Sequence, residues 1–165
     1  MVWERCGEMK NILCEQSNLS NEASVETWFV DPLLNLLFYQ ASDIKLKTSI
    51  QEFRVGLGRK SVNYKPDYIL LIKGFPTVVI DAKSPTENID NWISQCSSYC
   101  LELNRSYLHN PVKFFILTNG LQTVLYQWDR DKELISLSFG DFDKGNDLFL
   151  KFQQYVGKTA LEKKY

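Results

Sequence analysis

The sequence predicts an α/β domain in which helices flank a central mixed β-sheet. Along the 165 residues, segments with helical and with strand periodicity follow one another in the order helix, strands, helix, strands, helix. The strand segments are short, apolar and rich in β-branched residues, and tight-turn sequences join several of them. This order is typical of a sheet covered by helices, and the length suits one domain, so we expect a single domain over residues 1–165.

The first long helix is expected just after residue 20. Ser20 or Asn21 is a suitable N-cap for it. Apolar residues then recur at helical spacing: Val25, Trp28, Phe29, Leu33, Leu36 and Leu37. Pro32 lies inside this pattern and predicts a kink or a break in the two residues before it. A short additional helix is expected within residues 1–18.

The next part of the chain is predicted to supply three strands. Residues 44–53 alternate between apolar and polar types, as in a half-buried strand. Residues 55–63 are expected to form a loop. Residues 67–72 and 76–82 are nearly continuous apolar runs, typical of buried strands, and the short Lys-Gly turn between them predicts a hairpin.

A second helix and a second group of strands complete the predicted domain. Thr86 is expected to cap the helix, which presents an apolar face through about residue 103. After it we expect a strand over 112–117, a turn over 118–120, a strand over 123–128, a polar turn over 129–132 and a strand over 134–137. A closing helix over 142–155 and a frayed tail over 158–165 are expected to end the chain.

Composition limits the classes of function. The net charge is -1, so no overall positive field indicates a nucleic-acid partner. Basic residues do crowd one stretch: Lys45, Lys47, Arg54, Arg59, Lys60, Lys65 and Lys73. This stretch is either a solvated surface or a phosphate-binding face. No segment has the features of a signal peptide or a membrane span, so we expect a cytoplasmic protein whose four cysteines are free thiols.

Charged residues interrupt the two buried strand sequences. Asp67 opens the first run, whereas Asp81 and Lys83 end the second. Pairing as a hairpin would place Asp67 beside Asp81, and strand alternation would point Asp81 and Lys83 to the same face. A structural ion pair is the simplest explanation of such a cluster. Two carboxylates and an ammonium at one end of a sheet also predict a cation site.

The predicted site has the chemistry of a metal-dependent hydrolase. Two neighbouring carboxylates repel each other unless a divalent cation lies between them, and oxygen ligands suit Mg²⁺ or Mn²⁺. The main-chain carbonyl of Ala82 is a further candidate ligand. Lys83 is then placed to position the attacking water or to stabilise charge on a phosphate.

These motifs resemble the PD-(D/E)xK nuclease superfamily. Tyr64-Lys65-Pro66-Asp67-Tyr68 and Val79-Ile80-Asp81-Ala82-Lys83-Ser84-Pro85 are similar to its core motif. Within it, the chain most resembles the nuclease domain at the N-terminus of type I restriction enzyme R subunits. Three further segments carry this likeness: Glu22–Glu26 with Phe29–Leu34, Gln95–Tyr99, and Thr118-Asn119-Gly120. The resemblance covers roughly residues 22–126.

The resemblance implies a restriction-endonuclease-like fold and Mg²⁺-dependent cleavage of DNA, with Mn²⁺ as a possible substitute. It implies that Asp67 and Asp81 are metal ligands and Lys83 the catalytic lysine, although many relatives have Glu in place of Asp81. The first helix would supply one more acid to the metal. Glu22 and Glu26 lie four residues apart on one helix face, and we favour Glu26 as a ligand.

The resemblance also predicts contacts with DNA. Gln95 and Tyr99 match the Gln-x-x-x-Tyr motif of the group, although Tyr99 also lies on an apolar helix face typical of the core. Arg59 and Lys60 follow two nearby glycines, Gly56 and Gly58, and are expected at a hairpin tip that touches DNA. DNA is therefore the expected partner, together with a helicase or translocase motor or other restriction subunits.

Other chemistries fit the sequence less well. The four cysteines match no common zinc or iron–sulfur spacing, and a single histidine, His109, excludes histidine-rich metal sites and histidine-dependent triads. No P-loop sequence is present, so the chain cannot itself be the motor. The alternative to an active nuclease is a catalytically silent module of the same fold that binds DNA or docks a partner.

Overall fold

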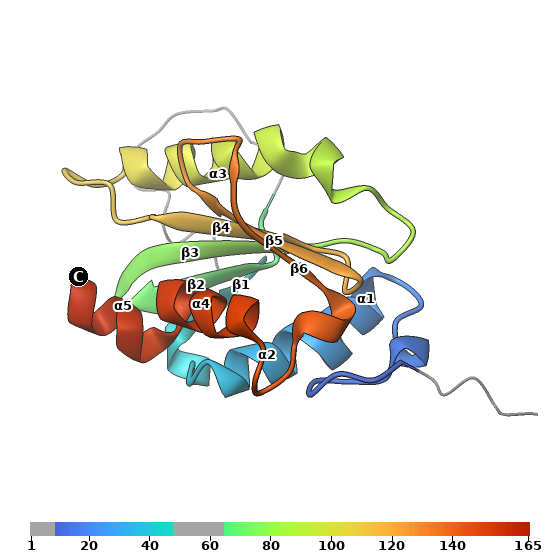
Figure 1. Ribbon diagram of the computed structural model, residues 1–165. Coiled ribbons are helices and arrows are strands. Elements are labelled where there is room, and N and C mark those ends of the chain that lie inside the picture. Colours follow the sequence, from blue (N-terminus) through green and yellow to red (C-terminus); the bar gives the residue numbers. More distant parts are fainter. Residues whose placement is uncertain (1–8, 48–64) are drawn as a thin grey trace, which may run out of the picture.

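A mixed β-sheet is the central layer of the protein (Figure 1). The computed structural model describes residues 9–47 and 65–165. Across the sheet, its strands are β1 (Ile44–Leu46), β2 (Tyr68–Ile72), β3 (Phe75–Ala82), β4 (Phe114–Thr118), β5 (Gln122–Gln127) and β6 (Glu133–Ser138). Among the strands of the described residues, only β3 and β4 run parallel, and the other neighbours are antiparallel. The predicted mixed sheet and both predicted hairpins, β2–β3 and β4–β5, are confirmed.

Helices cover both faces of the sheet. α3 (Ile93–Arg105) lies on one face and joins the parallel pair β3 and β4, as a crossover must. The opposite face carries α1 (Glu22–Val25), α2 (Asp31–Leu36), α4 (Asp147–Val156) and α5 (Lys158–Lys164).

Two apolar cores result from the alternation of side chains along the strands. In β3, Val78 and Ile80 belong to the larger core under α1, α2, α4 and α5, whereas Val79 belongs to the core under α3. Both faces of the central strands are buried, which explains their continuous apolar sequences.

The first helix begins where the sequence predicts. The side-chain oxygen of Asn21 accepts a hydrogen bond from the Ser24 N–H at 2.8 Å, and the Ser24 hydroxyl accepts one from the Asn21 N–H at 2.9 Å. The turn Glu26–Val30 is π-helical, with the N–H of Asp31 donating to the carbonyl of Glu26. Widening the turn relieves the clash that Pro32 would cause in a regular helix, and the predicted irregularity before Pro32 is confirmed.

Two predictions about helix starts are wrong. Thr86 does not cap the second helix, because a turn closed by the Glu87 N–H to the Ser84 carbonyl at 2.9 Å comes first. Asn88 provides the cap instead, and a 3-10 helix, Ile89–Trp92, leads into α3. The closing helix α4 also starts later than residue 142, because Asn146 caps it by accepting a hydrogen bond from the Phe149 N–H at 3.1 Å.

The prediction of a helix within residues 1–18 is wrong for residues 9–18, the part that the structure describes. Residues 9–18 contain a bridge between Lys10 and Glu15 and a 3-10 turn, Gln16–Asn18. The side-chain oxygen of Asn11 accepts hydrogen bonds at 2.8 Å from two backbone N–H groups that follow it, which competes with helix formation.

The tail over 158–165 is not frayed. It forms α5, whose Leu161 is 1% exposed and packs into the larger core. The backbone N–H of Lys158 donates to the Leu37 carbonyl at 3.1 Å, and its ammonium lies 2.8 Å from an Asp43 carboxylate oxygen. These contacts offset the entropy cost of ordering the end of the chain.

Some expectations lie outside the described residues or concern the membrane. The strand predicted over 44–53 is described only as β1, and the loop over 55–63 lies outside the description. In the part of the chain that is described, no helix has the length and apolar character needed to cross a membrane.

Candidate functional site

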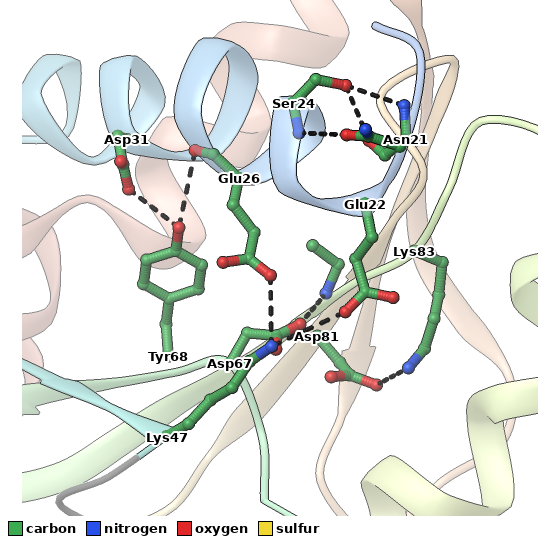
Figure 2. A network of polar contacts seen from close by, with 11 residues as sticks. Asn21, Glu22, Ser24, Glu26, Asp31, Lys47, Asp67, Tyr68, Asp81 and Lys83 are labelled. Carbon is green, nitrogen blue, oxygen red and sulfur yellow. Dashed lines mark hydrogen bonds and ion pairs between the residues drawn. The ribbon is translucent and has the colours of Figure 1, made fainter.

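The predicted acids meet at one end of the sheet, beside the start of the first helix (Figure 2). Asp67 immediately precedes β2 and is 3% exposed. Its Oδ2 accepts a hydrogen bond from the backbone N–H of Ala82 at 2.7 Å. The β2–β3 register, in which Tyr68 lies opposite Ile80, therefore holds Asp67 against the end of β3, as the predicted hairpin requires.

Asp81 and Lys83 point to the same face, as strand alternation predicts. The Lys83 Nζ lies 2.9 Å from Asp81 Oδ2. Among the described residues, however, no group donates an aligned hydrogen bond to this buried oxygen. Burial, and then the neighbouring Asp67 carboxylate, raise the pKa of Asp81 to about 7. The carboxylate of Asp81 is thus poorly compensated and is suited to an additional positive charge.

Lys83 is held between an acid and an aromatic ring. Its Nζ lies 3.8 Å from the ring centroid of Trp92, and the indole N–H of Trp92 donates to a Glu87 carboxylate oxygen at 3.0 Å. Burial opposes the charged form of Lys83, but the Asp81 carboxylate outweighs it and raises the lysine pKa. The ammonium is therefore retained at neutral pH at a fixed position near both acids.

The first helix supplies two more carboxylates. Oxygens of Glu22, Glu26 and Asp67 all lie within 4.8 Å of one another. The Tyr68 hydroxyl donates to Asp31 Oδ1 at 2.8 Å and lies 3.5 Å from the Glu26 carbonyl, so β2 fixes the π-helical turn that carries Glu26. Burial and the nearby Asp67 raise the pKa of Glu26.

Lys47 fills the space among these three acids. Its Nζ lies 2.7 Å from Asp67 Oδ1, 3.3 Å from Glu26 Oε1 and 3.6 Å from Glu22 Oε1. Its hydrogen bond to Asp67 raises the pKa of Lys47 despite partial burial, so its positive charge is secure. From the sequence, Lys47 was assigned only to a basic stretch, and its place among the acids was missed.

Pairing between β1 and β2 explains the position of Lys47. Leu46 lies opposite Tyr68 in this antiparallel pair, so the next step along each strand brings Lys47 beside Asp67. The apolar and polar alternation around residue 45 predicted a strand but not its neighbour. The register in which this strand pairs with β2 was needed to predict that Lys47 lies beside Asp67.

The donor set fits a divalent cation with oxygen ligands. Glu22, Glu26, Asp67 and Asp81 contribute carboxylates within one small region, where the described residues place two ammonium groups, those of Lys47 and Lys83. Burial of Asp81 beside Asp67 favours an additional positive charge there, even with Lys83 Nζ 2.9 Å from Asp81 Oδ2. Hard oxygen donors of this kind suit Mg²⁺ or Mn²⁺.

Comparison with known families identifies the chain. The family described as type I restriction enzyme R protein N terminus matches residues 48–133, just over half of the chain. The chain belongs to this family. Among solved structures, it is similar at 20% identity and a TM-score of 0.49 to a chain of a DrdV–DNA complex determined by cryoEM, over 84% of this chain and 82% of that one. No curated protein matches.

The predicted resemblance to the R-subunit N-terminal domain is thus confirmed, and the structure places most of its predicted site residues together. Asp67, Asp81, Lys83, Glu22 and Glu26 converge. Their catalytic and metal-binding roles stay predictions. The backbone of Ala82 takes part through its N–H, and the role of its carbonyl as a ligand also stays a prediction.

The Gln-x-x-x-Tyr segment of this type I R-protein domain lies on α3. The amide of Gln95 donates to the Tyr99 hydroxyl at 2.8 Å across one helical turn. Tyr99 is buried in the core under α3, in agreement with the core alternative, while Gln95 is half-buried. The contact of either residue with DNA stays a prediction. Arg59 and Lys60 lie outside the described residues.

The cysteines and the histidine of the described residues are not members of the acid cluster formed by Glu22, Glu26 and Asp67. Cys14, Cys96 and Cys100 are free, as expected, and Cys6 lies outside the described residues. His109 is exposed and makes edge-on ring contacts with Phe75.

Proposed function

We propose that this R-protein N-terminal domain is a metal-dependent DNA endonuclease of the PD-(D/E)xK type. The observation that carries the proposal is the buried pair Asp67 and Asp81, with an incompletely compensated carboxylate oxygen, next to the ammonium of Lys83. Membership of a restriction-enzyme family supports the same reading.

The carboxylates would hold the cation. Asp67 is central, because it contacts the end of β3 through Ala82 and also faces the two glutamates of the first helix. Asp81 would bind from β3, and Glu26, the more buried of the two helical acids, would bind from the helix. When bound, Mg²⁺ would lower the pKa of a water molecule and neutralise charge on the scissile phosphate.

Lys83 would act on the reacting groups. Its ammonium is a hydrogen-bond donor with three protons, fixed by Asp81 and by the face of Trp92. From that position it would orient the attacking water or donate to a phosphate oxygen as negative charge develops in the transition state.

DNA would be the substrate, and larger restriction subunits would be partners. Gln95 and Tyr99 on α3, together with Arg59 and Lys60, would contact the DNA backbone. The net charge of -1 gives the domain little long-range attraction for DNA, so we expect a helicase or translocase motor to deliver the substrate.

Plasmid cleavage with Mg²⁺ or Mn²⁺ tests the proposal. Asp67→Asn keeps an oxygen that can accept from the Ala82 N–H but removes the charge, so we expect cleavage to fall by about a hundredfold or more. Asp43→Asn is the matched control, because Asp43 is also ion-paired with a lysine at 2.8 Å but at the opposite end of β1. Equal loss in both variants, or none in Asp67→Asn, would contradict the proposal.

A catalytically silent module is the second candidate function. The position of Lys47 favours it, because its ammonium contacts three of the acids and already offsets part of their charge without a metal. Calorimetric titration with Mn²⁺ separates the two: the silent module binds none, whereas the nuclease binds Mn²⁺ in a manner that Asp67→Asn abolishes.

A further inference from the structure

Lys47 is a charged side chain whose position the proposed reaction does not explain. It extends from the end of β1 into the space bounded by Glu22, Glu26 and Asp67 (Figure 2). Its side chain is 46% exposed, so it reaches the acids from the solvent side and has room to leave. By contrast, the side chain of Lys83 is 11% exposed and held by Trp92.

The oxygens that contact Lys47 are those that a cation would need. Its Nζ lies within 3.6 Å of one oxygen from each of the three acids. Oxygens around an octahedral Mg²⁺, with bonds of about 2.1 Å, lie about 3–4 Å apart, and the three acids already approach that spacing. One point therefore suits either an ammonium or a metal ion, but not both.

We infer that Lys47 is an internal counter-ion that occupies the acid cluster in the metal-free domain and is displaced when a divalent cation binds. This inference rests on the proposed function, because it assumes that the cluster holds a metal. Without a metal, Lys47 stabilises the site by partly offsetting the charge of three carboxylates that would otherwise repel one another. It also lowers the affinity of the site for the cation, since the cation must first break its ion pairs.

Once displaced, the ammonium of Lys47 remains tethered beside the site. The end of β1 fixes its backbone next to Asp67, so its side chain stays within reach of a phosphate bound at the same end of the sheet. Binding of the metal would thus break the ion pairs of Lys47 and leave its ammonium able to contact a DNA phosphate.

Mn²⁺ binding to the full 165-residue chain tests the inference. Lys47→Met removes the ammonium and keeps the length of the side chain, so we expect the dissociation constant for Mn²⁺ to fall by about tenfold or more. The melting temperature in EDTA should fall, because the acids lose their counter-ion. Lys158→Met is the matched control: Lys158 also bridges two carboxylates, at 2.8 and 3.9 Å, and should leave Mn²⁺ affinity unchanged.

A measurement on the wild-type chain tells displacement of Lys47 apart from a through-space effect of its charge. It does not require that any variant folds. Trace acylation of lysine amines, followed by peptide mass spectrometry, reports whether each ammonium is engaged. We expect Lys47 to be modified several-fold faster in Mn²⁺ than in EDTA, with Lys158 unchanged. Equal rates for Lys47 in both conditions would overturn the inference.

The outcomes also separate this inference from the proposed function. If the wild type binds Mn²⁺ and Asp67→Asn does not, but Lys47→Met binds no more tightly, then the metal site stands and the counter-ion role is wrong. If neither the wild type nor Lys47→Met binds Mn²⁺, both the metal site and the counter-ion role are overturned.

Discussion

At the scale of single residues, Asp81 gives the strongest support for the proposed cation site. Burial and the neighbouring Asp67 raise its pKa to about 7, so the folded chain holds this proton more tightly than the unfolded chain does. In the absence of metal, the contribution of Asp81 to the free energy of unfolding is therefore greatest below about pH 4. It declines as the pH rises towards about 7.

Asp81→Asn tests this linkage directly, with denaturant unfolding in EDTA. The variant should match the wild type near pH 3 and become progressively more stable than it as the pH rises to 8, because the wild type then buries an ionised carboxylate beside Asp67. The difference should reach a few kcal/mol at most, since one pKa unit corresponds to about 1.4 kcal/mol. Parallel pH profiles for the two proteins would contradict a raised pKa.

We predict that Trp92 positions Lys83, so that its substitution affects catalysis without removing a reacting group. Trp92→Leu loses the ring under the ammonium, so we expect the turnover number for DNA cleavage to fall by about 3- to 30-fold with little change in KM. Trp92→Phe keeps a ring and should restore part of the rate. A rate for Trp92→Leu equal to that of the wild type would exclude this role.

At the scale of elements, the joint between β2 and the first helix sets the geometry of the site. Tyr68→Phe removes the hydroxyl that bonds Asp31 and approaches the Glu26 carbonyl, at a cost of about 1 kcal/mol in the free energy of unfolding. Because Glu26 lies on the π-helical turn that this hydroxyl holds, we also expect weaker Mn²⁺ binding in calorimetry.

Tyr39→Phe provides the matched control for that prediction. The buried Tyr39 hydroxyl donates to the Val156 carbonyl at 2.7 Å, near the junction of α4 and α5 and away from the acids. Tyr39→Phe should lower the free energy of unfolding by a similar amount and leave Mn²⁺ affinity unchanged. Equal effects of the two variants on metal binding would mean that Tyr68 acts only through general stability.

At the scale of the whole molecule, α5 is an integral part of the larger core. Leu161→Ala should lower the free energy of unfolding by about 2–4 kcal/mol, because it opens a cavity where the side chain is 1% exposed. Leu148→Ala on α4, where the side chain is 40% exposed, should change it by less than about 0.5 kcal/mol. An unchanged melting temperature for Leu161→Ala would indicate the frayed tail that the sequence suggested.

Prediction from sequence succeeded where one local rule decides the outcome. Alternation along β3 was enough to place Asp81 and Lys83 on one face, and the short turn before β3 was enough to bring Asp67 beside them. Lys47 was missed because its place depends on the pairing of β1 with β2, a tertiary choice that periodicity does not encode. The order of the last residues likewise depends on a tertiary contact, the burial of Leu161.

The most direct test of the central claim is the rate of plasmid cleavage by Lys83→Met at a Mn²⁺ concentration that saturates the site. Lys83 is proposed to act on the reacting groups rather than to hold the metal. The variant should therefore bind Mn²⁺ at least as well as the wild type, and cut about a hundredfold more slowly or worse. Cleavage by Lys83→Met at the wild-type rate would show that the cluster at the end of β3 is not the active site of a nuclease.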